Sequence, residues 1–230
     1  MNRPIAAFDF DGTLLDGDCL LILHSLVRLP LGRMNDGLRL LPALMLWKSG
    51  LLSTALFKQA VLQRLLTPAM QVRALPQRQA LLNTHLCNAI WHRLRPEALT
   101  RLEWHRQQGH RVVIVSASPR CLLQPVAERL GVELIATETT DPCDGTPIKL
   151  SSPNCKGPEK LRRLQTWLQE PLNSTELHAY GDSRGDRELL QSSVHPHWRS
   201  FSAPDRPYPS PPNKIAFLVG LPACAKIISH

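Results

Sequence analysis

The chain is poor in aromatic residues, which make up only 5% of its 230 residues. Its six cysteines are scattered singly, with no CxxC pair and no zinc-ligand spacing, so the sequence predicts a reduced, cytoplasmic protein. No apolar run is long enough to span a membrane, because Pro42, Lys48 and Gly50 interrupt the most apolar stretch, residues 40–57. No secretory leader is expected either, since residues 1–4 run directly into a strand-like segment.

Acidic residues are nearly absent from one part of the chain. Between Cys19 and Arg95 ten basic residues stand against one acid, Asp36, so this stretch carries +9 while the whole chain carries +8. A solvated helix face explains such a stretch, and so does peripheral contact with the anionic inner surface of a membrane. Aromatic and arginine residues do not alternate as they do on nucleic-acid platforms, so no nucleic-acid partner is expected.

Strand and helix patterns alternate along most of the remaining chain. This alternation predicts an α/β fold, with a Rossmann-like parallel sheet and helices on both faces. Residues 18–95 have helical periodicity and almost no strand signal, which predicts a helical cap inserted into a core of residues 1–17 and 96–230. Within that core, residues 204–230 read as a proline-rich loop and an apolar tail. Strands are expected at residues 5–10, 111–115, 132–136 and 176–180, helices at 119–131 and 157–168, and a hairpin or loop at 139–150.

Two carboxylates one residue apart, Asp9 and Asp11, lie at the end of the first predicted strand, in the segment DFDGT. Asp and Gly are common in turns, so a plain turn is one interpretation. The pair also suits a metal site, or a nucleophile with an acid/base partner.

A second pair, Asp182 and Asp186, follows the predicted strand at 176–180. A helix cap is the simpler interpretation of this pair alone. In a parallel sheet, however, all carboxyl ends of the strands open on one edge, so both pairs would converge there. Four carboxylates could not all remain ionised without a cation, and their hard oxygen ligands point to Mg²⁺.

Smaller polar groups follow the other strands. Ser116 and Ala117 lie at the expected end of the second strand, before a helix whose backbone amides suit a phosphate; Ser116 as a simple N-cap is the alternative. Lys156 lies in the loop before the next helix, where a lone lysine is usually a solvated charge. These residues indicate a phosphate site only when they are considered together with the carboxylates.

The four segments, in this order, resemble the motifs of the haloacid dehalogenase superfamily of phosphohydrolases: DFDGT at 9–13, SAS at 116–118, Lys156, and GDSRGD at 181–186. The resemblance covers the core from end to end. The insertion after the first motif is similar to the C1 helical cap of subfamily IB, which includes phosphoserine phosphatase. The leucine-rich stretch at 38–56 is similar to relatives that include a phosphatidylglycerophosphate phosphatase.

The resemblance implies a Mg²⁺-dependent phosphomonoester hydrolase. Asp9 would attack the phosphorus and form an aspartyl-phosphate, while Asp11 would protonate the leaving oxygen and later activate water. Ser116, Ala117 and Lys156 would hold the phosphoryl group. The metal would be bound by Asp9, Asp182 and the backbone carbonyl of Asp11, with Asp186 in or just behind the first shell.

Substrate identity stays open at this point. Asp18 and Arg64 are candidates for specificity contacts in the cap, and phosphoserine, a phospholipid headgroup and other small phosphomonoesters all remain. Gly185 departs from phosphoserine phosphatases, which tend to carry Asn there. Two further alternatives are a phosphotransferase that uses an acceptor other than water, and a non-catalytic protein whose basic surface binds lipid or nucleic acid.

Overall fold

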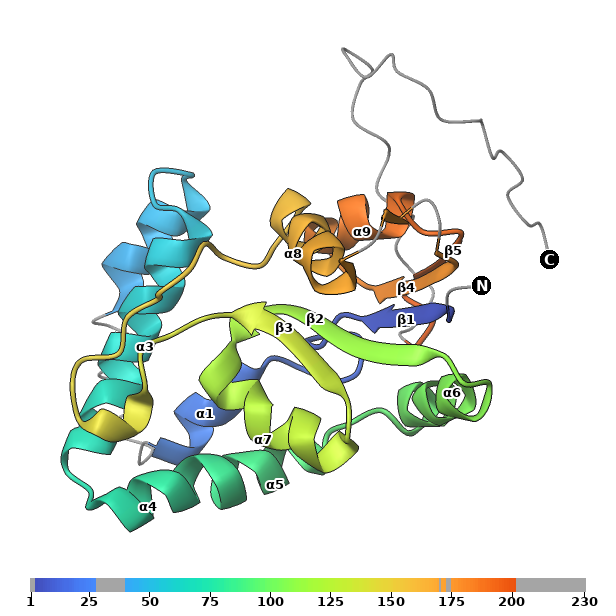
Figure 1. Cartoon of the computed structure of the whole chain (residues 1–230). Coiled ribbons are helices and arrows are strands. Elements are labelled where there is room, and N and C mark those ends of the chain that lie inside the picture. The colour runs from blue at the N-terminus through green and yellow to red at the C-terminus, as the bar shows by residue number, and fades with distance from the viewer. Residues whose placement is uncertain (1–2, 28–39, 170, 173–174, 202–230) are drawn as a thin grey trace.

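The computed structural model describes residues 3–27, 40–169, 171–172 and 175–201. Five parallel strands form one sheet in the order β3-β2-β1-β4-β5. β1 lies in the centre, and the chain crosses to the other side of β1 after β3 (Figure 1). The strands are β1 (Ile5–Phe8), β2 (Arg111–Pro119), β3 (Glu133–Thr137), β4 (Leu177–Gly181) and β5 (His195–Trp198).

Helices cover both faces of the sheet. All four residues of β1 are buried, and because successive side chains point to opposite faces, Ala6 and Phe8 join one apolar core while Ile5 and Ala7 join another. Helices α6 and α7 lie on the first face and α8 and α9 on the second (Figure 1). The helices are α6 (Pro96–Gln107), α7 (Arg120–Leu130), α8 (Pro158–Leu168) and α9 (Arg187–Gln191).

The segment between β1 and α6 is helical. We call its described part, residues 19–27 and 40–95, the helical insertion. It contains a helix over residues 40–48 and the elements α1 (Cys19–Val27), α3 (Thr54–Gln71), α4 (Leu75–Ala80), the π-helix η1 (Leu81–Leu86) and α5 (Cys87–Trp91). α3 begins at Ser53, whose hydroxyl accepts a hydrogen bond from the amide of Leu56.

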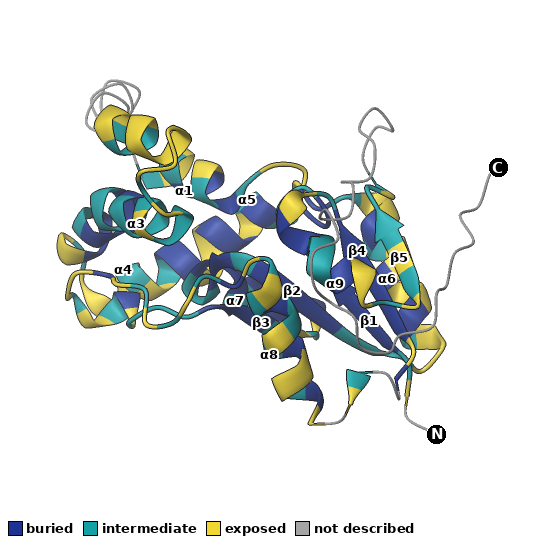
Figure 2. Ribbon diagram, turned by 90° about the horizontal axis from the view of Figure 1, so that it is seen from above, coloured by how far each residue is buried: buried dark blue, intermediate teal, exposed yellow. Residues whose placement is uncertain are grey.

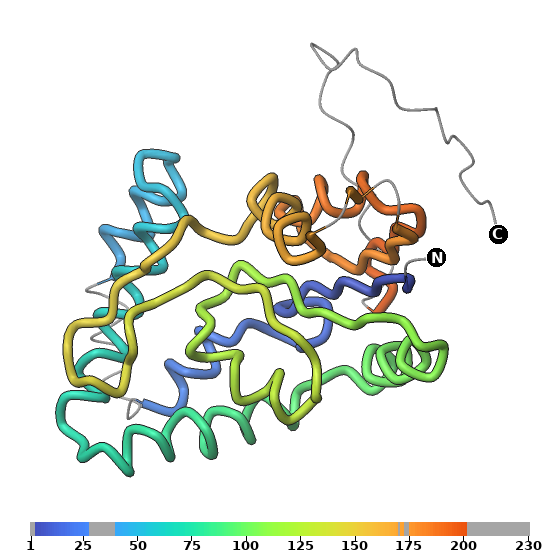
Figure 3. Tube along the Cα trace, in the orientation of Figure 1, coloured from blue at the N-terminus to red at the C-terminus, as the bar shows by residue number. Residues whose placement is uncertain are grey.

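The helical insertion contacts the core through the segment between β3 and α8. The amide of Ile148 donates to Thr67 Oγ1 at 3.1 Å, and that of Leu150 to Gln59 Oε1 at 3.3 Å. Figure 3 shows this segment beside α3. Because these bonds join backbone to side chains on α3, the segment is held along that helix.

The predicted α/β class, with a parallel sheet covered on both faces, is confirmed. β2 is longer than expected: it runs to Pro119, with a register shift after Val115, instead of ending at residue 115. The edge strand β5 was not predicted. The expected turn-rich region contains the short 3₁₀ helix η2 (Pro142–Asp144) between the bridged residues Thr139 and Leu150.

The expected proline-rich loop and apolar tail, residues 204–230, lie outside the described residues. In the part of the chain that is described, none of the helices has the length and apolar character needed to cross a bilayer.

Candidate active site

Both carboxylate pairs lie where the carboxyl ends of β1 and β4 meet. This is the point at which the strand order reverses, and open α/β sheets bind ligands there. A cavity of about 310 Å³ opens between the strand ends and the start of the helical insertion. Its lining consists of Asp9, Asp11, Gly12, Gly17, Asp18, Ser116, Ala117, Lys156, Lys160, Asp182, Ser183, Gly185 and Asp186.

Asp9 is held by a lysine that the sequence reasoning did not single out. Lys160 Nζ lies 2.5 Å from Asp9 Oδ1 and 2.5 Å from Asp186 Oδ1, and all three side chains are buried. Burial raises the pKa of Asp9 to about 8, and the Asp186 carboxylate acts in the same direction, although Lys160 opposes both. Burial alone would lower the pKa of Lys160, but Asp186 and Asp9 raise it overall, so the lysine is charged.

Asp186 is fixed by the turn that follows β4. Its Oδ2 accepts hydrogen bonds from the Ser183 hydroxyl at 2.8 Å, the Ser183 amide at 3.0 Å and the Asp182 amide at 3.3 Å. Burial alone would raise the pKa of Asp186, but Lys160 and Ser183 lower it overall. Asp186 is therefore both an ion-pair partner and, with the N-cap residue Ser183, a member of the capping box of the short helix η4 (Arg184–Asp186).

Three carboxylates fit a hard divalent cation. One oxygen each from Asp9, Asp182 and Asp186 lies within 4.8 Å of the other two. Asp182 Oδ1 is buried with no hydrogen-bond partner in the described protein, and burial followed by the Asp186 charge raises the pKa of Asp182. One lysine cannot neutralise this set, and oxygen ligands of this kind suit Mg²⁺.

Gly12 makes room for this carboxylate set. A Cβ at Gly12 would lie 2.2 Å from Asp182 Oδ2, and the backbone there has φ +79°, which L side chains rarely adopt. The glycine of DFDGT thus serves both the turn and the close approach of Asp182.

Asp11 is oriented by hydrogen bonds from two other segments. The amide of Cys19, at the start of α1, donates to Asp11 Oδ1 at 2.8 Å, and the hydroxyl of Ser118 donates to Oδ2. Burial, together with the charge of Asp18, raises the pKa of Asp11 to about 6. A carboxyl with a pKa in this range can give and take a proton near neutral pH.

The end of β2 brings further groups to the cavity. Ser116 Oγ accepts a hydrogen bond from the Ser118 amide at 3.0 Å, and Ser116 and Ala117 line the cavity as expected. Lys58 of α3 donates to the Ala117 carbonyl at 2.6 Å and to Asn154 Oδ1 at 3.2 Å. Lys58 therefore joins the helical insertion to the core beside the site.

Lys156 and Lys160 differ in burial and in their contacts. Lys156 is exposed and lines the cavity, whereas the buried Lys160 contacts Asp9. A signal for this was present, since Lys160 lies on the buried face of α8 with Leu164 and Leu168, and a buried lysine requires partners. The close approach of Lys156 also accounts for glycine at position 185, because a Cβ there would lie 2.9 Å from Lys156 Cγ.

The two specificity candidates have different surroundings. Asp18 lines the cavity and caps α1 by accepting hydrogen bonds from the amides of Leu20 at 2.8 Å and Leu21 at 3.3 Å. Arg64 does not belong to the described lining of this cavity. It lies six residues after Lys58 on α3, so it is turned by about 240° around the helix axis from the residue that reaches the site.

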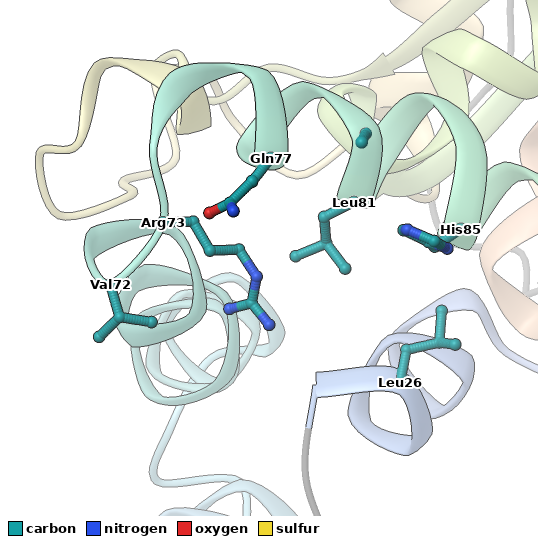
Figure 4. Close-up of a pocket in the computed structure, with 7 residues that line it drawn as sticks. Leu26, Val72, Arg73, Gln77, Leu81 and His85 are labelled. Atoms are coloured by element: carbon teal, nitrogen blue, oxygen red, sulfur yellow. The ribbon is translucent and has the colours of Figure 1, made fainter.

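A larger cavity, of about 610 Å³, lies within the helical insertion between α1 and the α3–η1 region (Figure 4). No carboxylate occurs among its described lining residues, so it offers no comparable set of oxygen ligands. Its lining consists of Leu26, Val72, Arg73, Gln77, Ala80, Leu81 and His85.

Comparisons with known proteins show the family and the fold. A family model for haloacid dehalogenase-like hydrolases matches residues 6–191. Protein CicA of Caulobacter vibrioides is 31% identical over 201 residues, which are 86% of each chain. A protein of unknown function from Bordetella pertussis Tohama I has a similar structure, with a TM-score of 0.66 at 21% identity over 84% of this chain and 87% of that one. A substrate-bound phosphoserine phosphatase has a TM-score of 0.53 at 16% identity over 84% of each chain.

Proposed function

This chain belongs to the haloacid dehalogenase-like hydrolase family, and we propose that it is a Mg²⁺-dependent phosphomonoester hydrolase. The observation that carries the proposal is the pairing of two differently held carboxyls on one cavity. Asp9 contacts the ammonium group of Lys160 and belongs to the carboxylate set that fits a divalent cation, and both positive charges would oppose the rise in its pKa. Asp11 is bound to neutral donors, and its pKa of about 6 lies near neutrality. Such a difference suits a nucleophile and an acid/base partner.

In the first step, Asp9 attacks the phosphorus and the bond from phosphorus to the ester oxygen breaks. Asp11 gives its proton to the departing alkoxide, so a neutral alcohol leaves and an aspartyl-phosphate remains. Lys160 holds Asp9 Oδ1 at 2.5 Å, which leaves Oδ2 as the attacking oxygen, with only a 3.5 Å contact from Thr13 Oγ1.

In the second step, water attacks the phosphorus of the aspartyl-phosphate and Asp11 takes its proton. Inorganic phosphate leaves and the Asp9 carboxylate is regenerated. Ser118 and Cys19 keep the Asp11 carboxyl in one orientation through both steps. Ser116, Ala117 and Lys156 line the same cavity and are the proposed phosphate contacts.

The proposed ligands for Mg²⁺ are Asp9, Asp182, the backbone carbonyl of Asp11 and, directly or just behind them, Asp186. The unpartnered Asp182 Oδ1 supports this set. When bound, Mg²⁺ would neutralise the carboxylates and polarise the phosphoryl oxygens, so that an anionic nucleophile can approach an anionic substrate.

The proposed substrate is a small phosphomonoester. The cavity of about 310 Å³ is of a size that suits a compact ligand, and Asp18 on its rim could contact an amine such as that of phosphoserine. Arg64, which lies outside the cavity lining, receives no direct role in this proposal. The helical insertion is the proposed cap, because Cys19 and Lys58 bring it against Asp11 and Ala117.

A specific surface favours a second substrate class, the phosphate of a phospholipid headgroup. The helix and turn before α3 are mostly exposed (Figure 2) and carry large apolar side chains. Trp47 stacks on Phe57 of α3 at 5.0 Å. The exposed members are Leu41, Met45, Leu46, Trp47 and Leu51, followed by Leu56 in the first turn of α3. Beside the basic charge of this stretch, such side chains suit peripheral contact with an anionic membrane.

One experiment tests both classes. Phosphate release with Mg²⁺ is measured for phosphoserine, for phosphatidylglycerophosphate in vesicles and for several sugar phosphates, with Asp9→Asn as the blank. Phosphate release above the blank supports the hydrolase. The compound from which phosphate is released fastest identifies the substrate class. If the wild type matches its blank throughout, the hydrolase is refuted, and a phosphotransferase or a binding role takes its place.

A further inference from the structure

A cluster of histidines lies at the other end of the sheet from the carboxylates. In Figure 1 its elements lie at the side of the molecule away from α3. His178 precedes Asp182 by four residues along β4, which corresponds to about 13 Å of extended chain. The members are His105 at the end of α6, His110 in the next loop, His178 on β4, and His195 and His197 on β5.

Parallel pairing of β4 with β5 places two of these histidines side by side. His178 is opposite His195, and their rings stack with centroids 4.2 Å apart. Glu176, which precedes β4, brings one carboxylate oxygen to both. Its Oε1 lies 2.8 Å from His195 Nε2 and 3.5 Å from His178 Nε2. Two imidazole nitrogens and one carboxylate oxygen therefore converge.

The buried member of this trio has an unsatisfied nitrogen. His178 is only 9% exposed, and its Nε2 has no hydrogen-bond partner in the described part of the chain; the Glu176 carboxylate lies 3.5 Å away. The neighbouring rings of His105 and His110, at 4.8 and 5.4 Å, hold the His178 ring in place. An enclosed nitrogen of this kind is unfavourable unless another group satisfies it.

His105 serves as a support and not as a ligand of this trio. Its Nδ1 lies 2.9 Å from His110 Nδ1 and its Nε2 lies 2.9 Å from the Tyr180 hydroxyl, so both ring nitrogens have partners. This leaves Glu176, His178 and His195 as the candidate ligands, and the hydrogen bond between His195 Nε2 and Glu176 Oε1 would give way to the ion.

The spacing and charge of the trio suit a transition metal. Nitrogen and oxygen ligands about 2.0–2.1 Å from a tetrahedral Zn²⁺ lie about 3.3 Å apart, and the observed 2.8 and 3.5 Å fall on either side of that value. The His195 hydrogen bond lowers the pKa of Glu176, which supplies the negative charge.

We propose that Glu176, His178 and His195 form a binding site for a divalent transition-metal cation of the Zn²⁺ class. Both imidazoles would bind through Nε2. The partly exposed His195 ring would turn out of its stack on His178, and the proton that its Nε2 shares with Glu176 Oε1 would move to Nδ1 through solvent. The ion would tie the edge strand β5 to β4 and satisfy the buried Nε2 of His178. Imidazole nitrogen favours such ions over Mg²⁺, so the site is chemically distinct from the carboxylate set.

The test is Zn²⁺ binding to the tag-free full chain at pH 7.5, by equilibrium dialysis in the presence of saturating Mg²⁺. The variants are Glu176→Gln and His195→Ala, whose native side chains are 50% and 42% exposed, so the fold should survive each change. His92→Ala, at an exposed histidine after α5, is the matched control. Circular dichroism verifies the fold of every variant.

The expected result is one Zn²⁺ per wild-type chain and an affinity reduced at least about tenfold in each trio variant, but unchanged in the control. Zn²⁺ should also raise the Tm of the wild type and the control and leave that of the two trio variants nearly unchanged. The proposal is overturned if the wild type takes up no Zn²⁺ beside Mg²⁺, or if both trio variants bind it with wild-type affinity.

Discussion

Lys160 Nζ lies 2.5 Å from Asp9 Oδ1, and this contact joins α8 to the end of β1 inside the core. The same ammonium group contacts Asp186 at 2.5 Å, so one cation holds two buried carboxylates from the segments that follow β1 and β4. The ammonium group positions Asp9 and reduces the repulsion between the Asp9 and Asp186 carboxylates. Stability and chemistry therefore depend on the same side chain.

We expect Lys160→Met to destabilise the protein strongly and to abolish phosphate release. Removing one partner of a buried ion pair costs about 3–5 kcal/mol, because the other charge stays buried without compensation. Urea unfolding at pH 7.5 measures the loss. Lys156→Met, at an exposed position, is the control and should change the free energy of unfolding by no more than about 0.5 kcal/mol.

The ion-pair origin of that loss has its own test. In an Asp186→Asn background, Lys160→Met should cost clearly less, since one of the two carboxylates is already neutral. Equal losses in both backgrounds would show that Lys160 stabilises the fold by packing alone.

Asp11→Asn should lower kcat by about 100- to 10,000-fold, the range for loss of a general acid/base. The Asp9–Lys160 pair remains in this variant, so unfolding should change little. Asp16→Asn, at an exposed acid five residues further along, is the control and should keep wild-type turnover. Steady-state phosphate release measures both, and an Asp11→Asn enzyme with full activity would refute the assigned role.

Gly12→Ala should impair both stability and turnover. Its Cβ would lie 2.2 Å from Asp182 Oδ2, and the backbone has φ +79°. Gly50→Ala separates the two causes, because Gly50 has φ +80° but no atom within 4 Å of an added Cβ. Urea unfolding should show a backbone cost of about 1 kcal/mol for both variants and a further loss only for Gly12→Ala. Equal losses would mean that Asp182 moves aside without cost.

Removing the metal should stop phosphate release. The proposed ligands are carboxylate and carbonyl oxygens, so excess chelator should abolish turnover and added Mg²⁺ should restore it. Ca²⁺ should restore it poorly, because Ca²⁺ takes more ligands in a looser geometry. Undiminished release in excess chelator would remove the metal from the mechanism.

The histidine cluster should make the metal-free protein sensitive to acid. Burial lowers the pKa of His105 to about 3 and those of His178 and His197 to about 4, and the charges of His110 and Arg101 add to the effect at His105. The folded state therefore resists protonation that the unfolded chain accepts at its ordinary pKa of about 6.5. Stability is fully present above that pH and is lost as the pH falls from about 6.5 towards about 4.

Urea midpoints at pH 7.5 and pH 5, with chelator present, check this expectation. The wild type should lose stability between the two values, and His105→Gln, which keeps a hydrogen-bonding side chain without an imidazole, should lose less. His92→Ala, at the exposed control position, should behave as the wild type does. A wild-type midpoint that is equal at both pH values would contradict the prediction.

Much of the candidate site could be predicted from local sequence. Asp9, Asp11, Asp182 and Asp186 each follow a recognisable strand, and a parallel sheet brings the carboxyl ends of its strands to one edge. Their convergence therefore required only the fold class. Asp18 was a candidate only through the family resemblance, and the structure places it in the lining of the same cavity.

Other features depended on distances between segments that sequence patterns do not report. Lys156 and Lys160 are four residues apart, Lys156 before α8 and Lys160 on it, and only the packing of α8 against the sheet decides that Lys160 contacts Asp9. The absence of Arg64 from the described cavity lining likewise follows from how α3 is rotated. The edge strand β5 carries too few apolar residues to be recognised by its periodicity.

The sequence by itself determined the α/β class, the helical insertion pattern and the carboxylate set, because these follow from periodicity and from residues adjacent to strand ends. Only the tertiary structure decided which lysine is buried against Asp9 and which histidines meet Glu176. His178 and His195 are seventeen residues apart and become neighbours through the register of β4 with β5. Strand register is set by packing of the whole sheet, so no local pattern encodes that contact.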